Sequence, residues 1–221
     1  MSEIKIEDYH KIKKFLDEKQ VSLVAVSKTK PDSVILKLYE NGQKLFGENR
    51  VQELADKYKR LPKDIEWHMI GHLQRNKVKY IAGFVDMIQS VDSKKLLKEI
   101  NKEARKNKRM IKCLLQFHIA REDSKYGLSL EVARDILTTS EMSNVSIQGV
   151  MGMATFTDEQ SIIEKEFKNL DSIYKEIKMQ FYKEDENFKY ISMGMSGDYK
   201  TAIQCGSNMV RLGSVLFGAR H

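Results

Sequence analysis

The stretch SLVAVSKTKP, residues 22–31, ends an apolar run on a lysine. Residues 23–26 are Leu, Val, Ala and Val, a pattern that predicts a strand buried on both faces. Pro31 favours a helix directly afterwards. Barrels and open sheets of parallel strands place their active sites at the carboxyl ends of the strands, so Lys28 is a candidate functional residue.

The same alternation of strand and helix recurs along the rest of the chain. Amphipathic segments such as residues 31–42, 50–61 and 93–108 separate the apolar stretches, and Ser93 is expected to cap the last of these. One further helix is expected in front of the first strand. The eight expected strands lie within residues 22–28, 44–49, 65–72, 84–91, 111–119, 146–154, 190–196 and 208–218.

Short apolar strands that alternate with amphipathic helices predict a parallel sheet in an α/β fold. Eight such units in about 200 residues fit a compact (β/α)8 barrel. The rival is an open doubly wound sheet, but the glycine-rich dinucleotide fingerprint of that fold is absent from the sequence. We therefore expect a single TIM barrel with an extra N-terminal helix, with residues 1–221 as one domain.

The composition narrows the class of protein. Hydrophobic residues make up 41% of the 221 residues and only two are prolines, which argues against a disordered or fibrous chain. No apolar run approaches the roughly 20 residues that span a bilayer, and the charged N-terminal segment MSEIKIEDYHKIKKF has no signal-peptide core. Cys113 and Cys205 have no CxxC spacing. We expect core thiols, a cytoplasmic location and no membrane contact.

The net charge of +7 could favour phosphorylated ligands or nucleic acid. Most of the positive side chains alternate with acidic ones, as in residues 93–109, which is typical of a solvated helix face. The sequence contains no RNP-like aromatic motif, zinc finger or glycine-rich KH loop. A nucleic-acid-binding module, carried by residues 102–108, is the less favoured alternative.

The ends of the expected strands carry the candidate site residues. Strand parity puts Lys28 on the same face as Val24 and Val26, so an inward-facing strand would aim its amine at the barrel mouth. A desolvated amine there suits Schiff-base formation with an aldehyde, and the alternative is a solvated lysine. In chain order the strand ends give Lys28, Asn49, His72, the loop after His118, Met153, Ser196, and Arg211 with Gly213 and Ser214.

The segments SMGMSGDYKTAI and MVRLGS, near the C-terminus, offer small residues, hydroxyls and open backbone amides. Ser196 and Gly197 are expected to start a helix, and Gly213 and Ser214 lie on the expected eighth strand. Barrels frequently bind phosphate in the loops after strands seven and eight, which predicts a phosphate site here. Ordinary turn and capping chemistry is the alternative.

Arg211 has the strand parity of Met209 and Gly213 and is therefore expected to face the barrel interior. A guanidinium in that position needs a partner. A ring nitrogen that accepts a hydrogen bond would serve, and so would a carboxylate in a structural ion pair.

The motifs of this chain resemble, in order, those of the pyridoxal phosphate homeostasis proteins (the YggS/PROSC family). The resemblance extends over nearly the whole sequence and implies a barrel akin to the N-terminal domain of alanine racemase, a fold-type III barrel that binds pyridoxal 5'-phosphate (PLP) covalently. The matching stretches are AVSKTKP, FGENRVQE, WHMIGHLQRNK, IQSVDS, SKYGL, GVMGMA, SMGMSGDYKTAI and GSNMVRLGSVLFGAR.

The resemblance also assigns roles to residues at matching positions. It implies that Lys28 forms the Schiff base and that Arg211 lies beside the pyridine nitrogen. Asn49, from the GEN motif, would line the pocket. His72, from GHLQ, and Met153, from GMA, would lie near the cofactor. The phosphate-holding positions correspond to Ser196, Gly213 and Ser214.

A carrier function is favoured over catalysis. A fixed cation beside the pyridine nitrogen disfavours protonation of that nitrogen and weakens the ring as an electron acceptor. Racemisation also needs acid and base groups on both faces of the substrate carbon, and one of them in the resembled racemases comes from a second domain that we do not expect here. We expect a PLP-binding protein that contributes to intracellular PLP homeostasis or delivery, without robust turnover. The alternative is a small fold-type III PLP enzyme such as an amino-acid racemase.

Apo PLP-dependent enzymes are the expected partners, and the expected state is a monomer or weak dimer. His68 and His72 have HxxxH spacing, but on a strand and without a third ligand, so no metal site is expected. Lys125 is a candidate for a second amine that PLP could reach, but a solvated loop lysine is the favoured interpretation. His118 and Ala120 depart from the asparagine and serine that are more frequent in relatives, which could alter hydrogen bonding on the fifth strand.

Overall fold

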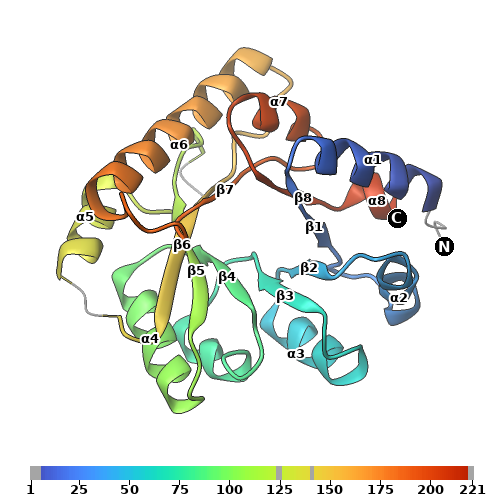
Figure 1. The fold of residues 1–221 in the computed structure, drawn as a ribbon, viewed down its shortest axis with the longest axis horizontal. Helices are drawn as coiled ribbons and strands as arrows, with labels where there is room; N and C mark the ends of the chain where they lie inside the picture. The colour runs from blue at the N-terminus through green and yellow to red at the C-terminus, as the bar shows by residue number, and fades with distance from the viewer. Residues whose placement is uncertain (1–5, 123–125, 140–141, 219–221) are drawn as a thin grey trace.

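Residues 6–122, 126–139 and 142–218 are described by the computed structural model. Their eight strands form one closed parallel barrel in sequence order, with helices around it, which confirms the predicted fold class (Figure 1). The strands are β1 (Ser22–Val26), β2 (Leu45–Glu48), β3 (Glu66–Met69), β4 (Met87–Val91), β5 (Ile111–Phe117), β6 (Val145–Gly152), β7 (Tyr190–Ser192) and β8 (Met209–Leu212). The helices are α1 (Ile6–Glu18), α2 (Asp32–Glu40), α3 (Val51–Arg60), α4 (Lys94–Lys106), α5 (Leu130–Thr139), α6 (Gln160–Phe181), α7 (Tyr199–Gln204) and α8 (Ser214–Phe217), with one 3-10 helix, η1 (Arg75–Tyr80).

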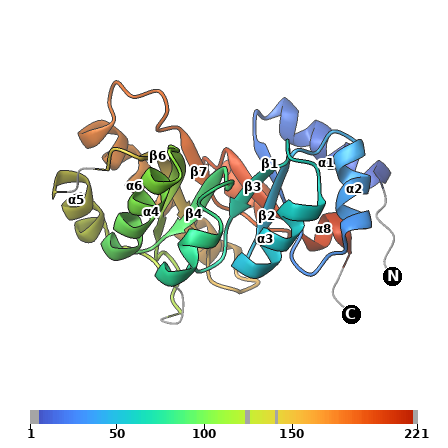
Figure 2. The ribbon, with the colours of Figure 1, turned by 90° about the horizontal axis from the view of Figure 1, so that it is seen from below.

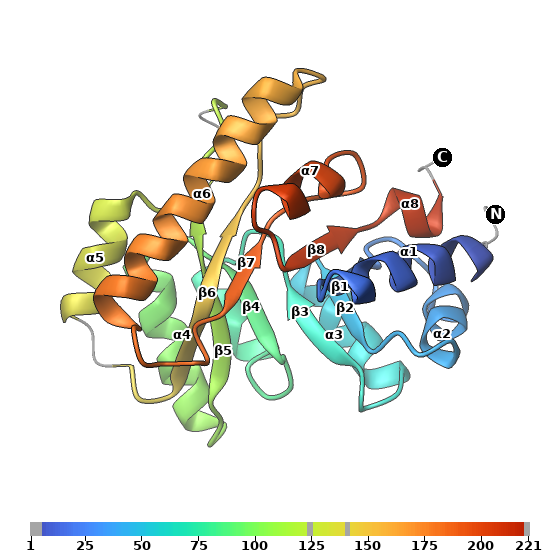
Figure 3. The same ribbon diagram turned by 45° about the horizontal axis from the view of Figure 1, so that its top comes forward.

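The helices surround the barrel, and two groups of them lie at opposite sides (Figure 1). Helices α4, α5 and α6 gather at one side, and α1, α2 and α8 at the other, as both the side view and the tilted view show (Figures 2 and 3). Helix α1 is the predicted extra N-terminal helix. The predicted cap of α4 is also present, because Ser93 Oγ accepts a hydrogen bond from Leu96 N at 3.3 Å.

The last strand is shorter than the apolar pattern predicted. Residues 208–218 were expected to be a single strand, but β8 ends at Leu212 and the apolar residues after Gly213 form the short helix α8. Leu216 and Phe217 are buried through this turn, so their apolar character comes from helix packing and not from a sheet. Two candidate site residues, Gly213 and Ser214, therefore lie at the start of α8 and not within β8.

The main core lies between the barrel and the helices. Large side chains that are almost completely buried fill it, among them Trp67, Phe46 and Phe167. A second, smaller apolar cluster consists of Val24, Met87, Leu114, Met151 and Met209. Val24 belongs to this separate cluster, whereas Leu23 and Ala25 belong to the main core, as alternation along a strand requires.

Side chains help to join β7 to β8. The ladder between these strands pairs Ser192 with Met209. Ser207 Oγ bonds the carbonyls of Met193 and Met209 at 2.7 and 3.0 Å, and Asn208 Oδ1 accepts from Ile191 N at 2.8 Å. These polar residues of the GSN sequence therefore support the position of β8 where its regular ladder is short.

The ends of β2 and β3 meet at a close backbone contact. A Cβ on Gly71 would lie 2.4 Å from Asn49 O and 2.7 Å from Asn49 Cα. Only glycine permits this approach, so the glycine of the GHLQ motif sets the position of the asparagine of the GEN motif.

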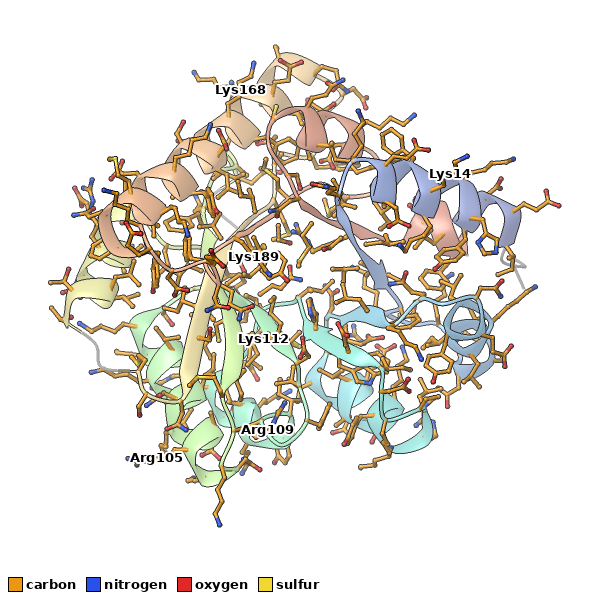
Figure 4. The ribbon with its side chains drawn as sticks, in the orientation of Figure 1. Lys14, Arg105, Arg109, Lys112, Lys168 and Lys189 are labelled. Carbon is orange, nitrogen blue, oxygen red and sulfur yellow. The ribbon has the colours of Figure 1, made fainter. Side chains whose placement is uncertain are left out.

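The positive charge is spread around the outside. Lys14, Arg105 and Lys168 extend from three different outer helices, α1, α4 and α6 (Figure 4). On α4, Lys102 pairs with Glu99 at 3.2 Å and Lys106 with Glu103 at 2.6 Å. The alternating charges of this segment therefore form local ion pairs along the helix.

The Gly71→Ala substitution should destabilise the protein by about 2 kcal/mol or more, because the new methyl group meets backbone atoms that cannot move aside without distorting β2 and β3. Gly197→Ala is the matched control, since a Cβ there meets no atom within 4 Å. Urea unfolding of both variants measures the difference. Equal stability of the two variants would contradict this account of the contact.

Candidate functional site

A cavity of about 460 Å³ opens at the carboxyl ends of β1, β2, β6, β7 and β8. Seven of the eight site residues predicted from the sequence line it, and only His72 does not. The described lining residues are Val26, Lys28, Lys30, Asn49, Ile70, Met153, Phe156, Met195, Ser196, Gly197, Arg211, Gly213, Ser214 and Gly218.

Lys28 lies two residues beyond β1 and is half-buried, with its side chain in the cavity wall. The next residue, Thr29, has a φ of +64°, a left-handed conformation that is unusual for a β-branched residue. Its backbone N–H donates to Glu53 Oε1 at 2.6 Å. The turn after Lys28 is thus strained locally and held by a carboxylate from α3.

A buried lysine on α3 holds the other side of the same turn. Lys57 Nζ donates to Ser27 O at 2.8 Å, to Glu48 Oε1 at 2.7 Å and to Glu53 Oε1 at 2.7 Å. Ser27 Oγ also donates to Glu48 Oε1, at 2.6 Å. The residues on both sides of Lys28 are therefore fixed by one ionic cluster, which we call the Lys57 cluster: Ser27, Glu48, Glu53 and Lys57.

Burial makes the Lys57 cluster costly to disrupt. The side chains of Glu48 and Lys57 are 0% and 3% exposed. Burial raises the pKa of Glu48, and the neighbouring Lys57 opposes that rise. An ion pair of this kind contributes little net stability by itself, but removal of one partner leaves an uncompensated buried charge.

Hydroxyl and amide groups gather at the β7 and β8 side of the cavity. Ser196 Oγ accepts hydrogen bonds from Gly213 N at 3.1 Å and from Val215 N at 3.3 Å. The Ser196 hydroxyl keeps its own proton for another acceptor. Gly197 and Ser214 also line this end, and a Cβ on Gly197 would meet no atom within 4 Å. The arrangement offers several neutral donors to an anion.

Arg211 faces the barrel interior, as strand parity predicted, and is 4% exposed. Its Nη1 donates to Ser192 Oγ at 2.7 Å and its Nη2 to Gly152 O at 2.9 Å. Burial lowers the pKa of Arg211 to about 10, and nearby Asp198 opposes the shift, so the group remains a cation at neutral pH. Neither of these two partners is a carboxylate, so the alternative of a structural ion pair does not explain the position of Arg211.

Asn49 and Met153 complete the predicted lining. Asn49 Oδ1 is buried and has no hydrogen-bond partner among the described residues. Buried polar atoms are normally paired, and an orphaned one beside a cavity fits a ligand that donates a hydrogen bond. Met153 packs against the interior cluster of apolar side chains and supplies an apolar surface.

His72 lies in the wall of a neighbouring cavity of about 620 Å³. Its Nδ1 is 2.9 Å from Asp92 Oδ2, and its ring stacks on Tyr126 with centroids 3.8 Å apart. These two contacts hold the imidazole toward the loop after β4. The structure therefore does not bring His72 together with the other predicted site residues.

Five lining residues were not singled out from the sequence: Lys30, Ile70, Phe156, Met195 and Gly218. Lys30 Nζ donates to Phe217 O at 3.1 Å and so links the β1–α2 loop to α8. Phe156 is 96% exposed, a signal that only the structure supplies. The sequence could have indicated Lys30 as a lining residue, because Lys30 follows Lys28 by two residues beyond the end of the same strand.

The remaining candidates lie elsewhere. His118 and Ala120 do not line the cavity, and His118 Nε2 lies 2.9 Å from Glu122 O. Lys125 is outside the described residues. Cys113 and Cys205 are buried free thiols.

Within residues 6–122, 126–139 and 142–218, no group of three or more His, Cys, Asp or Glu side chains could hold a metal ion. None of the helices in these ranges is both long and apolar enough to cross a membrane.

Comparison with known proteins identifies the class of barrel to which this chain belongs. The family model described as "Alanine racemase, N-terminal domain" matches residues 6–221. The barrel also superimposes on an alanine racemase from Clostridium difficile with a TM-score of 0.71 at 12% identity, covering 98% of this chain and 57% of that one, which shows a shared fold.

Relatives with higher sequence identity show to which family of these barrels the chain belongs. The pyridoxal phosphate homeostasis protein of Pasteurella multocida is 38% identical over 212 residues, which cover 92% of this chain and 88% of that protein. PipY of Synechococcus elongatus, 32% identical, superimposes with a TM-score of 0.90 in its structure without PLP, covering 96% and 99% of the two chains. Its structure with PLP bound gives a TM-score of 0.80 over 90% and 93%. This chain belongs to the family of pyridoxal phosphate homeostasis proteins.

The Lys57→Met substitution should destabilise the protein by about 3–5 kcal/mol, because Glu48 would then be buried without its cation. The Glu48→Gln/Lys57→Met double variant should recover part of that loss. Lys59→Met is the matched control on the same helix, since Lys59 is 72% exposed and forms an exposed pair with Asp56 at 3.3 Å, and it should leave stability nearly unchanged. Chemical unfolding measures all three. A Lys57→Met variant as stable as Lys59→Met would show that the Lys57 cluster does not hold the turn.

Proposed function

We propose that this chain binds PLP in the 460 Å³ cavity and holds it as a Schiff base on Lys28. One observation carries the proposal: an amine, a buried guanidinium and a group of hydroxyl and amide donors converge on a single cavity from β1, β7 and β8. These groups match the aldehyde, the ring nitrogen and the phosphate of PLP. The membership in the PLP homeostasis family and the PLP-bound structure of PipY support it.

Lys28 supplies the covalent attachment. Its ε-nitrogen adds to the aldehyde carbon, one water leaves, and a carbon–nitrogen double bond joins the two. The role of the Lys57 cluster is to keep the turn around Lys28 in one conformation, so that the amine stays directed into the cavity. The covalent bond requires no other reactant than the aldehyde itself.

The residues that would bind the phosphate group of PLP follow β7 and β8. Ser196 Oγ already accepts two backbone N–H groups and has its proton available for an anion. Gly197 and Gly213 have no side chain that would keep an anion away from the backbone, and Ser214 adds a hydroxyl donor. The net charge of +7 attracts anionic ligands in general but gives no selectivity among them.

Arg211 sets the electronic character of the site. PLP supplies an electron-accepting ring in enzymes that use it. A fixed guanidinium beside the ring nitrogen disfavours protonation there, which makes that ring a weaker electron acceptor. Arg211 is therefore suited to retention of the cofactor more than to carbanion chemistry.

The lining of the cavity also supports a carrier. Among the described lining residues, Lys28 and Lys30 are the only amines, and none is an aspartate, glutamate, histidine or tyrosine. A racemase needs an acid or base on each face of the substrate carbon. We infer a cytoplasmic, single-barrel protein, a monomer or weak dimer, that limits free PLP and delivers it to apo-enzymes, without robust turnover.

Purified protein incubated with PLP should show the visible band of a protonated Schiff base, and borohydride should fix the added mass on the peptide that contains Lys28. Lys28→Ala should lose the band and the label. Lys30→Ala is the matched control, because Lys30 also lines the cavity, and it should keep both. A label that maps to another lysine, Lys125 included, or a colourless protein would overturn the proposed attachment.

The alternative of a small amino-acid racemase is tested by turnover. Racemase and transaminase rates of the PLP-loaded protein, measured over a panel of amino acids, should not exceed those of Lys28→Ala with free PLP. Rates well above that control would establish an enzyme, even if the attachment at Lys28 is correct.

A further inference from the structure

A chain of buried polar side chains begins at Arg211 and passes through the interior of the barrel. Arg211 Nη1 donates to Ser192 Oγ at 2.7 Å, and Ser192 Oγ donates to Gln89 Oε1 at 2.6 Å. Ser192 and Gln89 are both 0% exposed. The guanidinium can only donate, so Ser192 must use its one hydroxyl proton on Gln89, and this fixes the direction of the first two bonds.

The chain continues to the opposite end of the barrel. Gln89 Nε2 donates to His68 Nδ1 at 2.7 Å. Since Nδ1 accepts, a neutral His68 carries its proton on Nε2, and that atom lies 3.5 Å from Asp86 Oδ2. Asp86 immediately precedes β4, whereas Arg211 lies near the end of β8, so the chain connects the two ends of the strands.

The three hydrogen bonds from Arg211 to His68 all point the same way, and beyond them His68 Nε2 lies 3.5 Å from Asp86 Oδ2 without a hydrogen bond between the two. Burial alone would raise the pKa of Asp86, but the neighbouring His68 and Lys112 side chains lower it. Lys112, labelled in Figure 4, lies 3.0 Å from Asp86 Oδ1. Arg211, in contrast, has no carboxylate within ion-pair distance in the described part of the chain. Aligned hydrogen bonds in a low-dielectric interior polarise one another, so the chain partly compensates the buried guanidinium.

We propose that Ser192, Gln89 and His68 are positioning residues that hold the Arg211 guanidinium in one orientation toward the cavity through this directed chain to Asp86. Gly152 O fixes a second nitrogen of the same group. With both contacts in place the guanidinium cannot rotate freely at the wall of the cavity that it lines. The effect of these residues on PLP binding rests on the proposed function, whereas the row of hydrogen bonds is present in the protein without any ligand.

Ser192→Ala and Gln89→Met each interrupt the chain without adding bulk. Each should weaken PLP binding about tenfold and shift the visible band, while the label on Lys28 persists. Their double variant should bind no more weakly than the weaker single variant, because both act on one chain. Ser90→Ala is the matched control: Ser90 is equally buried and adjacent to Gln89, but its Oγ has no hydrogen-bond partner in the described structure, so binding should stay within about twofold. Binding and spectra equal to those of Ser90→Ala would overturn the proposal.

Nitrogen-15 NMR of the unsubstituted protein tests the chain without PLP. The imidazole of His68 should be the neutral Nε2–H form, and the N–H groups of Arg211 should give separate signals because rotation is slow. In Ser192→Ala those Arg211 signals should merge. A protonated His68, an Nδ1–H tautomer or an already rotating guanidinium would overturn the proposal. If PLP does not bind the unsubstituted protein, the proposed function fails. The NMR measurement still tests whether the hydrogen bonds from Arg211 to His68 exist.

Discussion

The pairing of β1 with β8 is the constraint on which the site depends. These strands are parallel and in a register that places Val24 beside Arg211 and Ala25 beside Leu212. Closure of the barrel thereby brings Lys28, near the start of the chain, next to Gly213 and Ser214, near its end. In an open sheet β1 and β8 would not be paired and no common cavity would join these residues. The loop contact of Lys30 with Phe217 O reinforces the closure at the mouth.

The barrel carries two buried polar networks, and each supports one end of the cavity. The Lys57 cluster holds the turn that bears Lys28, and the chain through Ser192, Gln89 and His68 holds Arg211. An apolar interior would be more stable than one that contains these groups, because burial of polar and charged groups is costly. Rigid placement of Lys28 and Arg211 compensates for that cost if the site must bind a small ligand without rearrangement.

Much of the fold was predictable because burial on both faces makes the strands continuous apolar runs. Strand parity also predicted the inward orientation of Lys28 and Arg211. The Lys57 cluster was not predictable, since a lysine on an amphipathic helix has the same pattern whether it is solvated or buried. The end of β8 was placed wrongly because apolar residues 215–217 fit a strand and a buried helical turn equally well. His72 was grouped with the site by its position at a strand end, but contacts with Asp92 and Tyr126 direct it elsewhere.

The most direct test of the central claim is a crystal structure of the protein grown with PLP. The account predicts continuous electron density from Lys28 Nζ to the ligand, with the phosphate against Ser196 and Ser214 and the ring nitrogen beside Arg211. Ligand density in the cavity that contains His72, or a PLP molecule not joined to Lys28, would contradict it.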